Sequence, residues 1–304
     1  MEHGSTYGPN KTVGSELVNS LSRGLLVLEC FTLEEPRLTQ SNIQKLSKIP
    51  KSTLFRLLKT LTGLNYLKCD PESRRYFLGP KVLTLGFSVL QNLEVRGIAR
   101  AYLDSLSREF NRGVSLLMLD KDEMVFVERI RVPILRDFNI GIGSRIPVYN
   151  TAAGRAVLAH LSRERVVQIV KDIKKDGRTA SCIGKKGEKL FEILAEVRKQ
   201  GYAINDEESI KGVRAIAVPI FSAEGIAYAM NLVVPPEEIT VEELRRKYAP
   251  RLIEVGREIS EAMGYQDRSK GSRDLREKEI SAVNRKLPMK ARKAKARRSY
   301  VDIR

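Results

Sequence analysis

Histidine, cysteine and tryptophan are scarce in this sequence, and their scarcity excludes several classes of function. The chain has no tryptophan and two histidines, His3 and His160, so it cannot assemble a histidine-based catalytic triad or metal cluster. Its three cysteines, Cys30, Cys69 and Cys182, are far apart and odd in number, which argues against a disulfide framework and favours a reducing cytoplasm. We therefore expect no catalytic residues, no metal site and no cofactor.

Long hydrophobic runs are absent too. No stretch approaches the ~20 apolar residues that cross a bilayer, and the first ten residues lack the apolar segment of a signal peptide. We expect a cytoplasmic protein with no membrane partner. A length of 304 residues and a hydrophobic content of 42% allow two globular domains with tails.

The positive charge of the chain is concentrated in two short segments. The formal net charge is +17, of which residues 37–81 contribute +8 and residues 265–304 contribute +9, while residues 82–264 contribute only +3. Localised positive charge is typical of a protein that binds a polyanion, usually nucleic acid. Charge alone does not distinguish DNA, RNA and a membrane surface.

The first basic segment has the pattern of three helices and a hairpin. Apolar residues at helical spacing predict a first helix, and they are Leu17, Val18, Leu21, Leu25, Leu28 and Phe31. Thr39 is placed as the N-cap of a second helix with Ile43 and Leu46 on one face. A third helix is expected from Lys51 to Thr62, with a buried stripe of Leu54, Leu57, Leu58 and Leu61.

The opposite face of this third helix carries no carboxylate, so it suits a phosphate backbone and base edges. We expect its DNA-binding residues to be Lys51, Ser52, Thr53, Arg56, Lys59 and Thr60. Two β-rich runs, Tyr66–Cys69 and Arg75–Leu78, are joined by a turn that begins with Asp70 and Pro71. This hairpin resembles a wing that would bring Arg74 and Arg75 to the DNA.

The motifs of this segment are narrower than generic helix-turn-helix spacing. The run P-K-S-T-L-F-R-L-L-K-T-L at 50–61 and the later Y-F-L-G at 76–79 resemble the DNA-binding domain of the IclR family of bacterial and archaeal transcription regulators. The resemblance implies that the helix Pro50–Leu61 enters the major groove. It also implies a homodimer or tetramer that binds a pseudo-palindromic double-stranded DNA operator.

The remainder of the chain alternates strands and helices, which predicts an α+β domain with an antiparallel sheet. Helices are expected at Lys81–Leu90, Leu93–Phe110, Thr151–Leu161, 164–174, 187–200 and Thr240–Met263. Strands are expected at Val114–Leu119, Met124–Ile130, Leu135–Ile142, Gly201–Asn205, Arg214–Phe221 and Ile226–Val233. The helix from Lys81 is apolar on one side, so it forms either a dimer seam or a contact with its own domain.

Five segments follow from these patterns. We expect a disordered leader (1–14), a winged helix-turn-helix (15–79), a linker helix (80–97), an effector-binding domain (98–264) and a basic disordered tail (265–304). The basic block at 290–298 in the tail either adds non-specific phosphate contacts or only makes the chain more soluble.

The family resemblance continues into this second domain. The runs G-S-R-I-P-V-Y-N-T-A-A-G-R-A-V-L-A (143–159), G-Y-A-I-N-D-E-E (201–208) and G-V-R-A-I-A-V-P-I (212–220) resemble the family's GAF-like effector-binding domain. Matched one by one, the family's effector-binding positions fall on Ala152, Ala153, Asn205, Val213, Ala215, Leu232 and Val234. Leucine and valine at the last two positions favour a larger or more apolar acid, such as an aromatic one. The alternative is that all of these positions are plain core.

Three interpretations of the whole chain stay open. The first is a ligand-responsive DNA-binding regulator, and the second is a constitutive architectural or RNA-binding protein with an inert C-terminal domain. The third, an enzyme, is disfavoured because His160 ends a helix and the acidic run 206–208 has the pattern of a solvated turn. The predicted wing and third helix favour duplex DNA over RNA, because A-form RNA hides its major groove from a helix.

Overall fold

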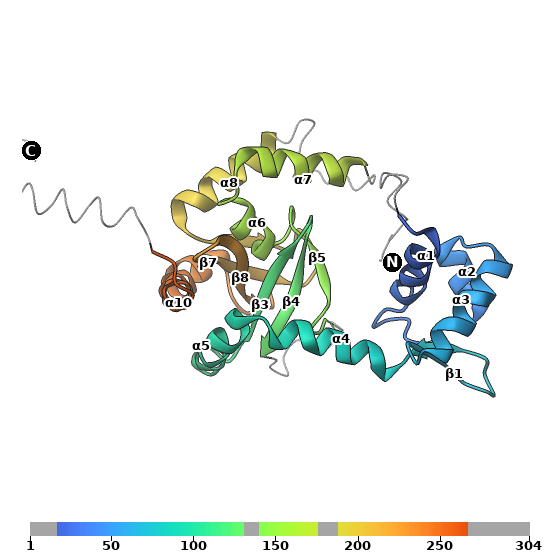
Figure 1. Cartoon of the computed structure of the whole chain (residues 1–304). Helices are drawn as coiled ribbons and strands as arrows, with labels where there is room; N and C mark the ends of the chain where they lie inside the picture. The colour runs from blue at the N-terminus through green and yellow to red at the C-terminus, as the bar shows by residue number, and fades with distance from the viewer. Residues whose placement is uncertain (1–16, 131–139, 176–187, 267–304) are drawn as a thin grey trace, which may run out of the picture.

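The computed structural model describes residues 17–130, 140–175 and 188–266. It confirms the predicted α+β class, with an N-terminal winged helix-turn-helix and a C-terminal domain built on an antiparallel sheet (Figure 1). The predicted leader and the basic block at 290–298 lie outside the described residues. None of the helices in the described part of the chain has the length and apolarity that a bilayer crossing requires.

Three helices and a two-stranded hairpin make the N-terminal domain. They are α1 (Asn19–Glu29), α2 (Gln40–Ser47), α3 (Lys51–Gly63), β1 (Leu67–Cys69) and β2 (Tyr76–Leu78). Leucines of α3 and apolar residues of the other elements share one small core, which consists of Val27, Phe31, Leu38, Ile43, Ile49, Leu54, Leu58 and Leu67. The core fixes α3 against α1 and α2 and leaves the other side of α3 facing outward (Figure 1).

Local chemistry sets the sharp turn between α2 and α3. The hydroxyl of Thr39 caps α2 by accepting a hydrogen bond from the backbone N–H of Asn42 at 3.2 Å, as predicted. Lys48 ends the helix in the left-handed conformation, with φ of 56°. Pro50 then caps α3 in an extended conformation. Only three residues, 48 to 50, therefore connect α2 to α3.

Two helices expose large apolar side chains. In α1 only Val27 is buried, whereas Leu21 and Leu25 of the predicted stripe, with Leu17 and Val18 just before the helix, are each at least half exposed. The helix that follows the wing, α4 (Pro80–Gln91), has no buried residue, and four of its large apolar side chains are exposed: Leu83, Leu85, Phe87 and Val89. Leu46 of α2 is also exposed, and Ser47 is buried instead.

The C-terminal domain is organised by a six-stranded antiparallel sheet with the order β5-β4-β3-β8-β7-β6. Its strands are β3 (Gly113–Asp120), β4 (Glu123–Ile130), β5 (Arg145–Pro147), β6 (Ala203–Asp206), β7 (Arg214–Ser222) and β8 (Gly225–Val234). Residues 131–139 lie outside the described part. The strand expected at Leu135–Ile142 falls mostly on these residues, and its described part, from Ile140 to Ile142, is not a strand.

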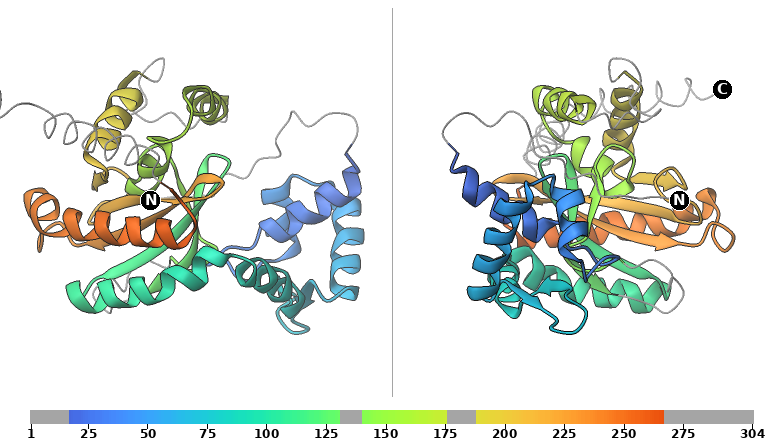
Figure 2. Two further views of the ribbon diagram at one scale, coloured as in Figure 1. Left: turned by 60° about the vertical axis from the view of Figure 1, so that its left-hand side comes forward. Right: turned by 90° about the vertical axis from the view of Figure 1, so that its right-hand side faces the viewer.

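Both faces of the sheet are covered by helices (Figure 2). One face packs against α6 (Ala152–Leu158), with α7 (Arg163–Lys175) and α8 (Glu188–Gln200) behind it. The other face packs against α5 (Glu94–Phe110) and α10 (Ala249–Ala262). Side chains alternate between two separate cores along each central strand, so a shift of one residue moves a side chain to the other core.

The helix expected over 240–263 is interrupted. A three-residue helix, α9 (Val241–Glu243), begins with a capping box of Thr240 and Glu243. A π-helical turn, η2 (Leu244–Tyr248), follows and leads into α10 with Pro250 in its first turn. Because Leu244 and Tyr248 are both buried, the wider turn keeps the apolar stripe of this segment directed at the sheet.

A buried carboxylate fixes the start of α5 to the sheet. The side chain of Glu128 in β4 is 4% exposed, and it forms ion pairs with Arg96 at 2.9 Å and with Arg100 at 3.2 Å. Both arginines lie in the first two turns of α5, which continues from α4 after a short break at Asn92 and Leu93. The pairs therefore join the central sheet to the helix that leads back to the N-terminal domain.

Candidate DNA-binding surface and effector site

The outward side of α3 is polar and cationic, apart from one ring. Leu54 and Leu58 are buried on the inner side, while Lys51, Ser52, Phe55, Arg56, Lys59 and Thr60 are exposed and Thr53 is half-buried. Lys51, Arg56 and Lys59 form no ion pair with any residue that the structure describes. Their charges are therefore available to an anion. The exposed ring of Phe55 was not among the residues predicted for this face, which were all polar.

The wing beside α3 is held by its own turn. The carboxylate of Asp70 accepts hydrogen bonds from the backbone N–H groups of Glu72 at 2.9 Å and Ser73 at 3.1 Å, and these bonds hold the pKa of Asp70 below its usual value. Arg74 takes the left-handed conformation with φ of 55°, and both Arg74 and Arg75 are exposed. Gly79 closes the wing, since a Cβ there would overlap with the carbonyl oxygen of Asn65.

The expected effector site is partly assembled beside α6. Ala152, Ala153, Asn205 and Ala215 are all buried on the face of the sheet that α6 covers, and Asn205 pairs directly with Ala215 between β6 and β7. Val213 lies one residue before β7 and is half-buried. Four of the predicted residues therefore belong to one face, and Val213 lies two residues before Ala215 of the same face.

The other two predicted effector residues face the wrong way. Leu232 and Val234 are fully buried in the core between the sheet and α5 with α10. Their neighbours Asn231 and Val233 face α6 instead, because side chains alternate along β8. Leu232 and Val234 therefore do not share a face with the other predicted residues, and the argument that leucine and valine form one wall of a site beside α6 does not hold.

Amide side chains gather on this face. The side-chain N–H of Asn205 donates to the carbonyl oxygen of Asn150 at 2.5 Å, and Ser209 donates to the side-chain oxygen of Asn205 at 3.1 Å. The side-chain oxygens of Asn150 and Asn231 are buried and accept no hydrogen bond from any described residue. An unsatisfied buried acceptor costs about 1–3 kcal/mol, so two of them on one face call for an explanation.

A close approach seats α6 on its preceding strand segment. A Cβ on Gly154 would overlap with backbone atoms of Val148, so only glycine fits there. The hydroxyl of Thr151 donates to the carbonyl oxygen of Pro147 at 2.6 Å and accepts from the N–H of Gly154 at 3.2 Å. These contacts fix the small residues at the start of α6 against the sheet.

The acidic run 206–208 is not a free solvated turn. Each of its carboxylates has a partner: Asp206 pairs with Arg214 at 2.7 Å, and Glu207 accepts from the N–H of Gly212 at 2.9 Å. Glu208 forms two parallel bonds with Arg155, at 2.7 and 2.6 Å. The Arg155 side chain is only 3% exposed and also donates to the carbonyl oxygen of Tyr149 at 3.0 Å. This pair ties the loop after β6 to α6.

His160 lies just beyond the end of α6 and is half-buried. Its ring stands edge-on to Phe221, with 5.1 Å between ring centroids. Burial, helped by the charge of Arg198, lowers the pKa of His160 to about 4, so the ring is neutral at pH 7. Across the described residues, His, Cys, Asp and Glu form no group of three that could hold a metal.

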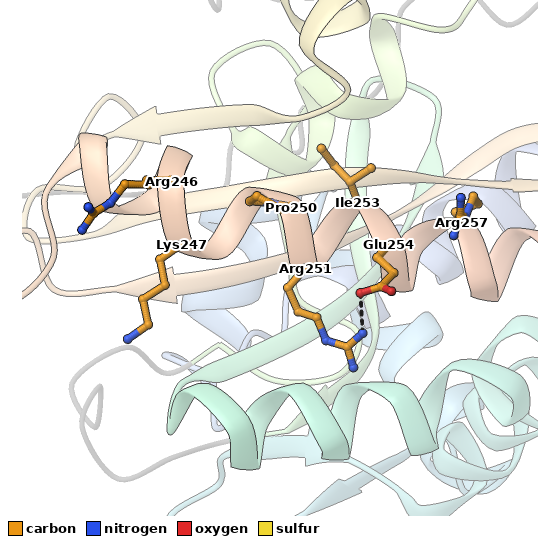
Figure 3. A pocket seen from close by; sticks show the side chains of 7 residues that line it. All are labelled: Arg246, Lys247, Pro250, Arg251, Ile253, Glu254 and Arg257. Carbon is orange, nitrogen blue, oxygen red and sulfur yellow. Dashed lines mark hydrogen bonds and ion pairs between the residues drawn. The ribbon is translucent and has the colours of Figure 1, made fainter.

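A separate depression of about 520 Å³ lies on the outer side of η2 and α10 (Figure 3). It is lined by Arg246, Lys247, Pro250, Arg251, Ile253, Glu254 and Arg257. Arg251 donates to Glu254 at 2.7 Å and to Glu109 at 3.2 Å. The depression is shallow and lies across the sheet from α6, so it belongs to neither candidate site.

Comparison with known families decides what this arrangement is. The family described as "Bacterial transcriptional regulator IclR C-terminal" matches residues 87–261, and "IclR helix-turn-helix domain" matches residues 20–71. The chain belongs to the IclR family of transcriptional regulators. Its fold and motifs are therefore those of DNA-binding regulators, as the sequence resemblance implied.

Relatives span most of the regulator's length. The HTH-type transcriptional regulator XynR of Escherichia coli is 32% identical over 82% of this chain and 98% of its own, and the Pca regulon regulatory protein of Pseudomonas putida is 31% identical over 80% and 84%. A solved IclR-family regulator from Brucella abortus is 30% identical, with a TM-score of 0.70 over 81% of this chain and 93% of its own. The regulator thus shares both of its domains with full-length members.

Removing the charge of Glu208 should destabilise the C-terminal domain. We expect Glu208→Gln to lower the free energy of unfolding by about 2 kcal/mol, because it leaves the buried Arg155 without its counter-charge. The exposed pair of Arg251 and Glu109 provides a matched control, and Glu109→Gln should cost less than about 1 kcal/mol. Chemical denaturation of both variants measures the difference. Equal losses would mean that the Arg155 pair is no stronger than a surface pair.

Proposed function

We propose that this regulator binds a specific double-stranded DNA operator through α3 and the wing, and that a small organic acid bound beside α6 controls that binding. The observation that carries the proposal is the exposed side of α3, which combines unpaired cations with hydroxyls and has no carboxylate. Because its target is DNA, the regulator would act in the cytoplasm.

The proposed DNA-binding residues divide by the chemistry that each can offer. Ser52, Thr53 and Arg56 would face base edges, since hydroxyl and guanidinium groups can read them. Lys51 and Lys59 would lie nearer the phosphates. Thr60 donates its hydroxyl to the carbonyl oxygen of Arg56 at 2.9 Å, so its oxygen lone pairs would accept from a base amino group and not from a phosphate. Arg74 and Arg75 of the wing would contact the backbone or the minor groove.

The proposed effector is a small acid that carries hydroxyl groups. The buried oxygens of Asn150 and Asn231 need hydrogen-bond donors, which hydroxyls supply. Ala152, Ala153, Val213 and Ala215 would line the site with small side chains, Asn205 with an amide and Val233 with an apolar edge. This class replaces the more apolar acid that the sequence favoured, because Leu232 and Val234 face the other core.

The proposed assembly is a homo-oligomer joined through α4. Leu83 and Phe87 are 71% and 53% exposed, and their spacing of four residues places them on one side of the helix. Exposed apolar side chains in such a group mark a contact surface. Pairing two copies here would hold two α3 helices at the fixed separation that a two-fold operator requires.

Substitutions on α3 should separate base reading from phosphate binding. We expect Arg56→Ala to weaken operator binding by about 1–3 kcal/mol and to relax one base preference. Lys59→Ala should weaken binding to all sequences alike and reduce the salt slope by about one. Titrations of operator and random duplexes at several salt concentrations measure both effects. If each variant loses operator and random DNA equally, α3 does not read bases, and the constitutive architectural interpretation gains support.

The effector site is tested by replacing its unsatisfied amide. We expect Asn231→Leu to raise the free energy of unfolding by about 1 kcal/mol, since a buried acceptor without a partner is removed, and to abolish the response to effector. The response is the change in operator binding with a panel of hydroxylated aliphatic and aromatic acids. Leu232→Val on the opposite face is the control: it should cost about 1 kcal/mol and leave the response intact. A responsive Asn231→Leu protein would remove Asn231 from the site.

The oligomer interface is tested by placing charge on α4. The double variant Leu83→Glu and Phe87→Glu should fold normally, because neither side chain is buried. We expect its mass in sedimentation to fall to that of a monomer and its operator affinity to drop at least tenfold, because two linked half-site contacts are lost. Thr84→Glu, at an exposed position on the same helix, is the control. An unchanged mass would place the interface elsewhere.

A further inference from the structure

One residue on the outward side of α3 does not fit a purely polar DNA-binding surface. The ring of Phe55 is 57% exposed, although the small core of the N-terminal domain lies on the other side of the same helix. It lies within a turn of Ser52 and Lys59 and next to Arg56 in sequence, all of them exposed. The aromatic side chain is thus surrounded by the groups proposed to meet DNA.

The chemistry of the major groove offers a partner for such a ring. Thymine is the base that presents an apolar group there, its C5-methyl, and phenylalanine side chains contact it. Lys51 and Lys59 lie one turn before and one turn after Phe55, so contacts of both amines with phosphates would bring the ring toward the groove floor. We propose that Phe55 reads a thymine in each half-site by packing its ring against the C5-methyl group.

The charges around the ring favour DNA over a second copy of this surface. Lys51, Arg56 and Lys59 surround Phe55, and no residue of α3 is acidic. Two such surfaces placed face to face would bring six unpaired cations together, whereas a phosphate backbone neutralises them. The inference rests on the proposed operator binding through α3, and its test separates the two.

The test removes the methyl group from the DNA and the ring from the protein. Operator duplexes are prepared with each thymine replaced in turn by deoxyuridine, which has the same hydrogen-bonding groups without the methyl. The wild-type protein should lose about fourfold in affinity at one thymine per half-site, as expected for one buried methyl group. Phe55→Ala should bind the unmodified operator more weakly and show no further loss on the deoxyuridine duplex.

Three comparisons make the result specific. Arg56→Ala and Leu64→Ala, the latter an exposed apolar residue at the end of α3, should each keep the fourfold loss on the deoxyuridine duplex. Phe55→Leu should keep part of it, because leucine remains apolar. Unfolding temperatures of the Phe55 variants should match that of the wild type, since the ring is outside the core.

The outcomes that would overturn the inference are distinct from failure of the proposed function. If Phe55→Ala retains the fourfold loss, or if no thymine position is sensitive in the wild type, the ring does not contact a methyl group. A fall in oligomer mass for Phe55→Ala would assign the ring to a protein interface instead. If Arg56→Ala also leaves operator binding unchanged, the role of α3 itself is refuted and not only that of Phe55.

Discussion

The C-terminal sheet is buried on both faces, and the alternation of side chains along its strands, interrupted by bulges near Leu116 and Ile220, governs what the rest of the domain can do. Along β8, Met230, Leu232 and Val234 fill the core beneath α5 and α10, while Ala229 and Asn231 turn toward α6. An antiparallel strand in this position has no solvated side, so no residue can be assigned to the ligand face by polarity alone. The face to which a side chain belongs depends on its place in the alternating pattern of the strand.

The face toward α6 differs from the other in composition. Large side chains such as Leu117 and Phe126 fill one part of it, whereas the part formed by β6, β7 and β8 carries alanines and amides. Gly154 allows α6 to approach its neighbouring segment closely, and Arg155 anchors the adjacent loop through Glu208. The opposite face is a conventional core of large aliphatic residues. The effector site proposed beside α6 would therefore lie among small residues and unsatisfied amides, with the firmly packed opposite face as its support.

Local patterns were sufficient to predict the helix-turn-helix. The leucine stripe of α3, the cap at Thr39 and the turn at Asp70 depend on neighbouring residues, and each appears as predicted. The sequence also predicted the central strands of the sheet to within two residues at either end. Predictions failed where long-range packing decides. Leu21 and Leu25 of α1 have helical periodicity but are at least half exposed, and the face to which Leu232 belongs cannot be read from a run that is apolar on both sides.

Sequence order also concealed pairs that only the fold brings together. Arg155 and Glu208 are 53 residues apart, so the acidic run looked like solvated loop until its partner was seen. Asn231 looked like one polar residue within an apolar strand, and its missing hydrogen-bond partner is a property of its surroundings. Phe55 is the opposite case. An apolar residue in a helix normally belongs to a core, and only the fold shows that this ring is exposed.

The ion pairs of Glu128 hold the start of α5 against the sheet, so a tilt of α4 would have its fixed point there. The twelve residues of α4 extend from this point toward the N-terminal domain and span about 18 Å at the usual helical rise. A tilt of about 10° at the clamped end would therefore move the far end by roughly 3 Å, close to the rise of one base pair of DNA. In the proposed complex, a small shift of β4 would thus displace the N-terminal domain by enough to change the alignment of α3 with the DNA bases.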